Sequence, residues 1–237
     1  MLTSTRDRIG AAAGAAFVAL IFAGNALDIT GTSQAAHPTG AQVLKDAAHQ
    51  ATSATSTVGF AMEFAGFAAF IVFVGYLIVT LRRRAANSIL GGTAIVAAVT
   101  MLAIKLGSAA PAGALLLDYK HMSADVAQVL NDMNGVAFVL SWMPFAILIG
   151  AMAAALRSAG LVGKPTAYIG IFLGVAGLLL AVVSLNDPVN GNPMAFLLGQ
   201  LWLLVVSVRL AVKPGTDSDA PSTSYAVQAQ DRVAVSA

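Results

Sequence analysis

Six long apolar stretches constrain the fold of this chain more than any other feature, because each is long enough to cross a bilayer as one helix. About 20 apolar residues span the roughly 30 Å of hydrocarbon in a membrane. Only 10% of the residues are charged, whereas soluble proteins carry about 25%. A membrane strand would alternate in polarity and be about half as long. The sequence therefore predicts an all-α, polytopic transmembrane helical bundle within residues 1–213, with spans at 9–28, 57–81, 89–110, 135–156, 167–186 and 194–212.

Positive charges predict the orientation of the bundle, because Lys and Arg accumulate in the cytoplasmic loops of membrane proteins. Ten of the 13 basic residues fall on one predicted side, whereas Lys45 and Lys120 fall on the other and Lys105 lies within a span. The ten are Arg6, Arg8, Arg82, Arg83, Arg84, Arg157, Lys164, Arg209, Lys213 and Arg232. Both termini are therefore expected in the cytoplasm, in a multi-pass protein of the cytoplasmic membrane whose partner is the lipid bilayer.

The two ends of the chain need separate interpretations. Residues 214–237 are rich in polar residues and Pro, so they are predicted to form a disordered cytoplasmic tail. The stretch 9–28 has an alternative reading as a cleavable signal peptide, because it combines a basic start with small residues near its end. Cleavage would leave five spans.

Several functional classes are disfavoured by what the sequence lacks. With no Cys, it has no disulfide, no thiolate metal site and no cysteine nucleophile. It has no H-E-x-x-H, G-x-S-x-G or G-x-G-x-x-G motif, and His37, His49 and His121 lack the close spacing of metal ligands. The basic residues are scattered rather than gathered on a face, which argues against a nucleic-acid partner. We therefore expect no catalytic residue, no metal and no cofactor, and an enzyme is the disfavoured class.

Two charged residues lie within predicted spans, where a charge is costly and therefore points to a role. Glu63 and Lys105 lie at depths of about 9 Å and about 8 Å from the outer ends of 57–81 and 89–110. Spans joined by a short loop are expected to be antiparallel neighbours, which predicts an intramembrane ion pair between these residues. The pair can serve helix packing or a transport path. Gly59 and Gly66 lie one turn from Glu63, so another helix can approach that carboxylate closely.

Further polar residues share this outer depth and predict a cavity between the helices, the usual place for a ligand site in a bundle. The candidates are Asn25, Asp28, Asp132, Asn134, Asn186, Asp187 and Gln200. An alternative is that these residues cap helix ends or contact interfacial water. Ser123 is expected to cap a helix that leads into the fourth span.

Small residues and one proline predict local features of the spans. Gly170, Gly174 and Gly177 form a face that allows either close packing within the chain or a homo-oligomer. Pro144 interrupts the fourth span and is expected to bend it, since proline cannot donate a backbone hydrogen bond to Leu140.

The motifs also resemble those of a family of six-pass membrane proteins from high-GC Gram-positive bacteria, a domain of unknown function of the 4386 type. The resemblance covers roughly residues 6–213. It lies in Thr5-Arg6-Asp7-Arg8 before the Ala-rich helix, in Val129-Leu130-Asn131-Asp132 before the fourth span, and in Leu201-Trp202 followed by Leu203-Leu204-Val205-Val206-Ser207-Val208. It implies a membrane location and transfers no catalytic residue.

Two functions remain after these exclusions. The leading hypothesis is a non-enzymatic membrane protein with a binding, regulatory or envelope role. The alternative is a small-solute or ion transporter or channel that uses the outer polar cluster with Glu63 and Lys105 as its gate or coupling pair.

Overall fold

The fold is entirely helical in the part of the chain that the computed structural model describes, residues 5–32, 38–84, 89–185 and 192–212. The helices are α1 (Thr5–Asp28), α2 (Gly40–Thr52), α3 (Ala54–Arg84), α4 (Ile89–Asp118), α5 (Ala124–Leu140), α6 (Trp142–Ser158), α7 (Lys164–Ser184) and α8 (Met194–Val212). Six helical segments are long and apolar enough to cross a membrane: α1, α3, α4, α5 with α6, α7 and α8. The predicted all-α polytopic fold is confirmed. The predicted tail 214–237 lies outside the described residues.

Two spans differ in detail from the prediction. The fourth, predicted at 135–156, begins at Ala124 and is divided at Ser141 into α5 and α6. The Ser123 hydroxyl oxygen accepts a hydrogen bond from the Val126 N–H at 3.3 Å and so caps α5 as expected. At the division, the Ser141 hydroxyl donates to the Phe138 carbonyl at 2.6 Å, one turn before Pro144. The third span, predicted at 89–110, continues to Asp118.

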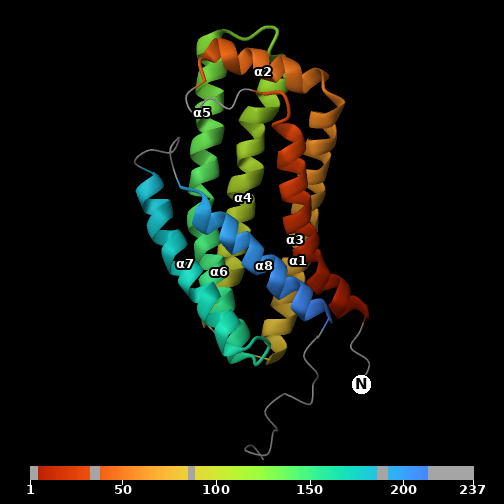
Figure 1. The fold of residues 1–237 in the computed structure, drawn as a ribbon, viewed down its shortest axis with the longest axis vertical. Coiled ribbons are helices and arrows are strands. Elements are labelled where there is room, and N and C mark those ends of the chain that lie inside the picture. Colours follow the sequence, from red (N-terminus) through yellow and green to blue (C-terminus); the bar gives the residue numbers. More distant parts are fainter. Residues whose placement is uncertain (1–4, 33–37, 85–88, 186–191, 213–237) are drawn as a thin grey trace, which may run out of the picture.

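The bundle has two chemically different ends (Figure 1). We call one the arginine end, because α3 ends there with Arg82, Arg83 and Arg84 and α6 ends there just after Arg157. The other is the α2 end, where α2 lies across the tips of the long helices. Helix α1 begins and helix α8 ends at the arginine end (Figure 1). The grouping of basic residues at one end agrees with the charge pattern, while the assignment of that end to the cytoplasm stays a prediction.

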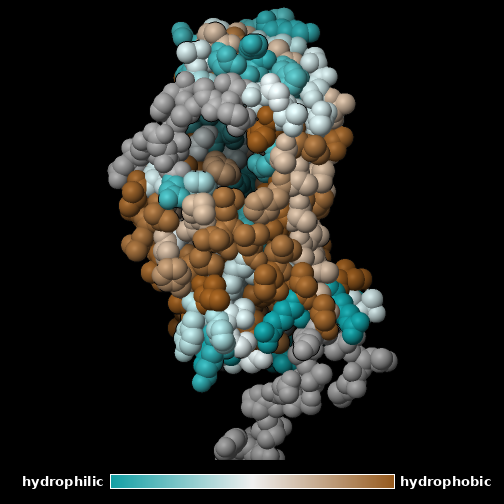
Figure 2. Space-filling view, viewed as in Figure 1, coloured by the Kyte–Doolittle hydropathy of each residue, from teal (hydrophilic) through white to brown (hydrophobic). Residues whose placement is uncertain are grey.

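The surface of α7 shows why the bundle suits a bilayer. Its buried residues are small, including Gly170 and Gly174, whereas Phe172 and Val175 are exposed. A soluble helix has the opposite arrangement. Figure 2 shows the same polarity over the whole face, with a hydrophobic band around the middle of the molecule and hydrophilic residues at both ends.

The helices form two groups. In one group, α3 packs along α1, and in the other α4 packs on α5 and α6, with α7 against α6. Helix α8 crosses between the groups and contacts α1, α6 and α7. The contact between α3 and α4 is slight, although the chain joins them by a short loop. The expectation that these two spans pack as close neighbours is therefore wrong for most of their length.

Glycines explain why α3 packs on α1. A Cβ atom on Gly59 would lie 2.8 Å from the Gly24 carbonyl oxygen, and a Cβ on Gly24 would lie 2.8 Å from that of Gly59. Both distances are too short for a side chain, so the two backbones touch at this crossing. About two turns further along α3, a Cβ on Gly66 would contact Ile21 and Leu20 of α1. The expected helix approach beside Glu63 is present, and α1 is the helix that makes it.

The glycine face of α7 is used in the same way within the chain. A Cβ on Gly174 would lie 2.6 Å from the Gly150 Cα on α6, and one on Gly177 would lie 3.1 Å from the Ala146 Cβ. A Cβ on Gly170 would meet Trp202 of α8. Because α6 and α8 already cover this face, it is not free for a second copy. Of the two uses predicted for this face, close packing within the chain is the one that these contacts show.

Two hydrophobic clusters stabilise the two ends. The larger fills the arginine half, where Phe70 and Phe73 of α3, Met152 of α6 and Leu203 of α8 are fully buried. The smaller joins α2 to the tips of α4 and α5 through Val43, Ala47, Leu115 and Ala127. The space between the two clusters is where the polar residues of the spans gather.

Substitution of a glycine on α3 tests the α1–α3 crossing. Gly59→Ala should lower the free energy of unfolding by about 1–3 kcal/mol, because the new methyl group meets backbone atoms that cannot move aside. Gly75→Ala on the same helix is the matched control, since nothing lies within 4 Å of a Cβ at that position. Thermal unfolding of each purified variant in detergent measures the difference. Equal melting temperatures for the two variants would contradict the crossing.

Candidate ligand-binding cavity

A cavity of about 1130 Å³ lies between the two helix groups in the α2 half of the molecule. Its walls come from α1, α3, α4 and α5, and residues of α2 lie across its top. Phe17, Met101 and Phe145 line its floor, where the buried core of the arginine half begins. Figure 2 shows it as a hollow that opens sideways below α2, with hydrophilic residues inside. The cavity exists because α3 packs along α1 and diverges from α4.

Polar side chains from six helices line this cavity together with a larger number of apolar ones. They are Asn25, Asp28, Asp46, Gln50, Glu63, Lys105, Ser108, Gln128, Asn131, Asp132, Asn134 and Gln200. The set includes both charged residues of the predicted ion pair and five of the seven residues proposed from the sequence. The other two, Asn186 and Asp187, lie outside the described residues.

The lining residues of α2 are not among those predicted from the sequence, nor are Ser108 of α4 and Gln128 and Asn131 of α5. Asp46 and Gln50 reach the cavity because α2 folds back over the bundle. Hydrogen bonds tie the end of α1 to this region, since Gln50 Nε2 donates to Asp28 Oδ1 at 3.4 Å and the Ser56 hydroxyl donates to the Asp28 carbonyl at 3.5 Å. The apolar spacing of Val43 and Ala47 was the available signal, because it marks a helix with one buried face.

Glu63 and Lys105 both line the cavity but do not contact each other. Within the described part of the chain, neither forms an ion pair, so the predicted direct contact is absent, although the two opposite charges attract each other across the cavity. The physical reason is the α1–α3 crossing, which holds the Glu63 side chain beside Gly24, where an added Cβ would lie 2.8 Å from its Cγ. The two charges therefore face one cavity from different walls.

Aromatic rings hold the Lys105 ammonium. Its Nζ lies 3.5 Å from the ring centroid of Phe138 on α5 and 5.5 Å from that of Phe196 on α8. Trp142 stacks on Phe196 with ring centroids 5.9 Å apart, which extends the aromatic wall. A ring face attracts a cation by about 0.5–2 kcal/mol, so these rings keep the ammonium in place without neutralising its charge.

Among the described residues, four carboxylates belong to the rest of the polar lining, together with amide and hydroxyl side chains. Asp46 accepts a hydrogen bond from Gln42 at 3.0 Å, and Asp132 accepts one from Gln128 at 3.0 Å. Helices α1 and α3 run antiparallel, so Asp28 lies beside Gly59 and Glu63 lies beside Gly24, which places the two carboxylates about one turn apart on the same wall. The cavity thus has carboxylates on α1, α2, α3 and α5 and a basic position on α4.

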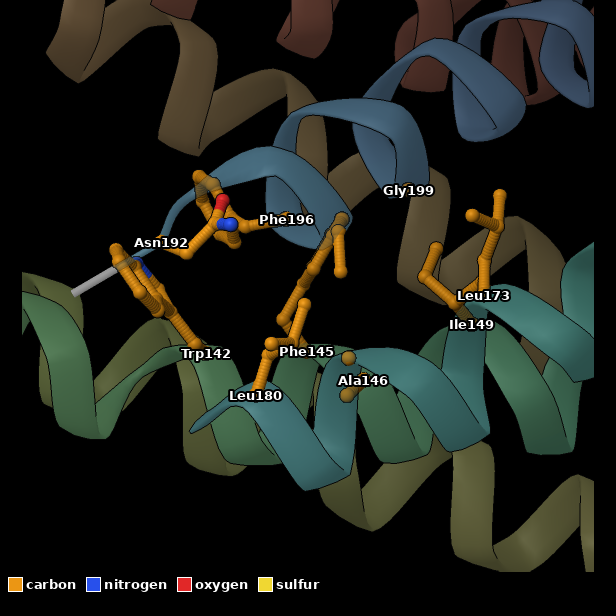
Figure 3. Close-up of a pocket in the computed structure, with 11 residues that line it drawn as sticks. Trp142, Phe145, Ala146, Ile149, Leu173, Leu180, Asn192, Phe196 and Gly199 are labelled. Carbon is orange, nitrogen blue, oxygen red and sulfur yellow. The ribbon is translucent and has the colours of Figure 1, made fainter. Parts of the chain in front are cut away.

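The floor of the cavity holds polar atoms without partners. Trp142 Nε1 and Gln200 Oε1 are buried and have no hydrogen-bond partner among the described residues. A separate space of about 10 Å³ lies between α6, α7 and α8, close to Trp142, Phe145 and Phe196 (Figure 3). It has room for about one water molecule, so it reflects packing rather than a ligand site.

The fold and the cavity define the class of this chain as a multi-pass α-helical membrane protein with a polar cavity in one half of its bundle. No group of three His, Asp or Glu side chains suited to a metal occurs in the described ranges. No family model, no curated protein and no solved structure matches the chain. The resemblance to the 4386-type family therefore stays a prediction.

A double-mutant cycle tests the separation of Glu63 and Lys105. Glu63→Gln and Lys105→Met should show a coupling energy of no more than about 1 kcal/mol, because the two charges attract each other across the cavity without a contact. The charge-swapped pair Glu63→Lys with Lys105→Glu should recover little of the stability lost by the single variants. Thermal unfolding in detergent provides both values. A recovered melting temperature in the swapped pair would show a direct ion pair.

Proposed function

We propose that this chain is a non-enzymatic binding protein of the cytoplasmic membrane, with its α2 end outside the cell and its arginine end in the cytoplasm. The observation that carries the proposal is the cavity of about 1130 Å³ with Glu63 and Lys105 in its wall. Charges at this depth are costly unless a partner or water compensates them. A ligand that enters the cavity supplies such compensation.

The packing of the arginine half favours a binding protein rather than an open channel. One continuous apolar core fills this half, and several of its large side chains are fully buried. They include Phe70, Phe73, Met152, Leu156 and Leu210. Such a core interrupts any aqueous path below the cavity floor in the described part of the chain. The cavity is therefore closed toward the arginine end, as expected for a receptor site and unlike a conducting pore.

The helix break at Ser141 supports transport as the second candidate. It divides the fourth span beside the cavity, with Phe138 and Trp142 of the lining on either side of it. Broken helices at membrane depth often form the moving parts of transporters. This candidate requires the apolar core to open toward the arginine end, and it predicts substrate flux in proteoliposomes that Glu63→Gln alters.

Single cysteines test the one-sided cavity, because the chain has no Cys of its own. In intact cells a membrane-impermeant maleimide should label Ser108→Cys and Gln128→Cys, since a thiol must meet water to form the reactive thiolate. Ser207→Cys should stay unlabelled, because Ser207 is 0% exposed in the bundle. Ser158→Cys, exposed at the arginine end, should react only after the membrane is permeabilised.

The labelling pattern has two contradicting results. An unreactive thiol at both cavity positions would remove the cavity from the account. Labelling of Ser158→Cys in intact cells would reverse the proposed orientation.

A further inference from the structure

We propose that the cavity binds a zwitterionic amphiphile from the adjoining leaflet, with its ammonium group at Asp28 and Glu63, its anionic group at Lys105 and its apolar part along the phenylalanines. This inference rests on the proposed function and specifies the ligand of the same cavity. Charge placement, apolar lining, the direction of the opening and the size of the cavity each contribute to it.

The charges of the cavity are separated rather than paired. Glu63 and Asp28 stand on the α1–α3 wall, while Lys105 stands on α4 against Phe138. Within the described part of the chain, Lys105 has aromatic neighbours and no carboxylate in contact. A ligand that carries both signs of charge satisfies both walls at once. A purely anionic ligand would meet the carboxylates, and a purely cationic one would leave Lys105 without a counter-ion.

Phenylalanines give the cavity an apolar surface next to the charges. Phe60, Phe64 and Phe67 line it from α3, and Phe22 lines it from α1. Phe64 is 55% exposed and Phe22 is 39% exposed, so both rings have area free for contact. Burial of apolar surface contributes about 25 cal/mol per Å², which is available to an acyl chain and not to a small polar solute.

The cavity opens sideways, toward the lipid that would surround the bundle in a membrane. In Figure 2 the hollow lies on the side of the molecule, directly above the hydrophobic band and below the hydrophilic α2 end. Pro193, Phe196 and Leu197 at the start of α8 line the cavity at this level. An amphiphile can therefore reach the polar interior with its head group while its tails stay in hydrocarbon.

The volume also favours a ligand with tails. Sites for drug-sized molecules measure about 300–1,000 Å³, and this cavity of about 1130 Å³ exceeds that range. A head group alone would leave most of the space and the exposed phenylalanines uncovered. The shared chemistry of ammonium and anionic group also occurs in small soluble zwitterions, so the experiment separates the two sources.

Ligand binding to the purified full-length chain in non-ionic detergent tests the inference by native mass spectrometry. Four compounds are compared: a short-chain phosphatidylethanolamine, a phosphatidylglycerol with the same chains, dodecyltrimethylammonium, and glycerophosphoethanolamine, which has no tails. Phosphatidylethanolamine should bind at least about tenfold more tightly than each of the other three, because only it combines both charges with tails.

Charge variants add a result that a folding defect cannot imitate. Glu63→Gln should weaken phosphatidylethanolamine binding and shift the preference toward phosphatidylglycerol, whereas Lys105→Met should shift it toward dodecyltrimethylammonium. Lys120→Met and Asp125→Asn remove exposed charges outside the cavity and should leave all four affinities unchanged. Opposite shifts in selectivity report the position of each charge, since a general loss of structure would weaken all ligands together.

Three outcomes overturn the inference. Equal affinities for the two phospholipids, or preferences that the two cavity variants do not change, would show that the separated charges do not select the ligand. Binding of glycerophosphoethanolamine as tight as that of the phospholipid would identify a small soluble zwitterion instead. If Ser108→Cys is labelled from outside while an amphiphile of one charge binds best, the inference fails and the proposed binding function stands. If Ser108→Cys and Gln128→Cys are both unlabelled, the proposed function fails as well.

Discussion

The close crossing of α1 and α3 at Gly24 and Gly59 is the contact on which the rest of the structure depends. Without side chains between them, the two backbones approach until a single added carbon would lie 2.8 Å from a carbonyl oxygen. Each helix gains dispersion contacts along this line, which in a bilayer replaces the hydrophobic drive available in water. Helix α3 therefore follows α1 and separates from α4, although the sequence order would allow the opposite arrangement.

The separation of α3 from α4 determines the electrostatics of the cavity. Glu63 belongs to the α1–α3 group, and Lys105 belongs to the α4 group, so the divergence of the helices keeps their charges apart. Phe138 and Phe196 stabilise the ammonium, which no carboxylate of the described residues contacts. The separation of Glu63 from Lys105 follows from helix packing alone. The suitability of the cavity for a dipolar ligand is a consequence of the same geometry.

Local properties of the chain were predictable, and pairwise packing was not. Hydropathy and length predicted the six spans. Depth along each span identified Asn25, Asp28 and Gln200 as candidates for one level of the bundle. Both predictions depend on the properties of one helix at a time. The Glu63–Lys105 contact depended on which helix α3 prefers. That preference is decided by Gly24 on a helix far away in the sequence. The fold of α2 over the cavity was missed for the same reason, since it rests on Leu115 and Ala127.

Disulfide trapping between helices tests the central claim, that α3 belongs to α1 and stands apart from α4, most directly. A Cβ on Gly66 would lie 3.4 Å from the Leu20 Cβ, close to the separation found in disulfides. In a chain without native Cys, mild oxidation should join Leu20→Cys to Gly66→Cys, while Glu63→Cys and Lys105→Cys at matching depth should remain unjoined. Efficient joining of the Glu63–Lys105 pair, with none between positions 20 and 66, would contradict the account.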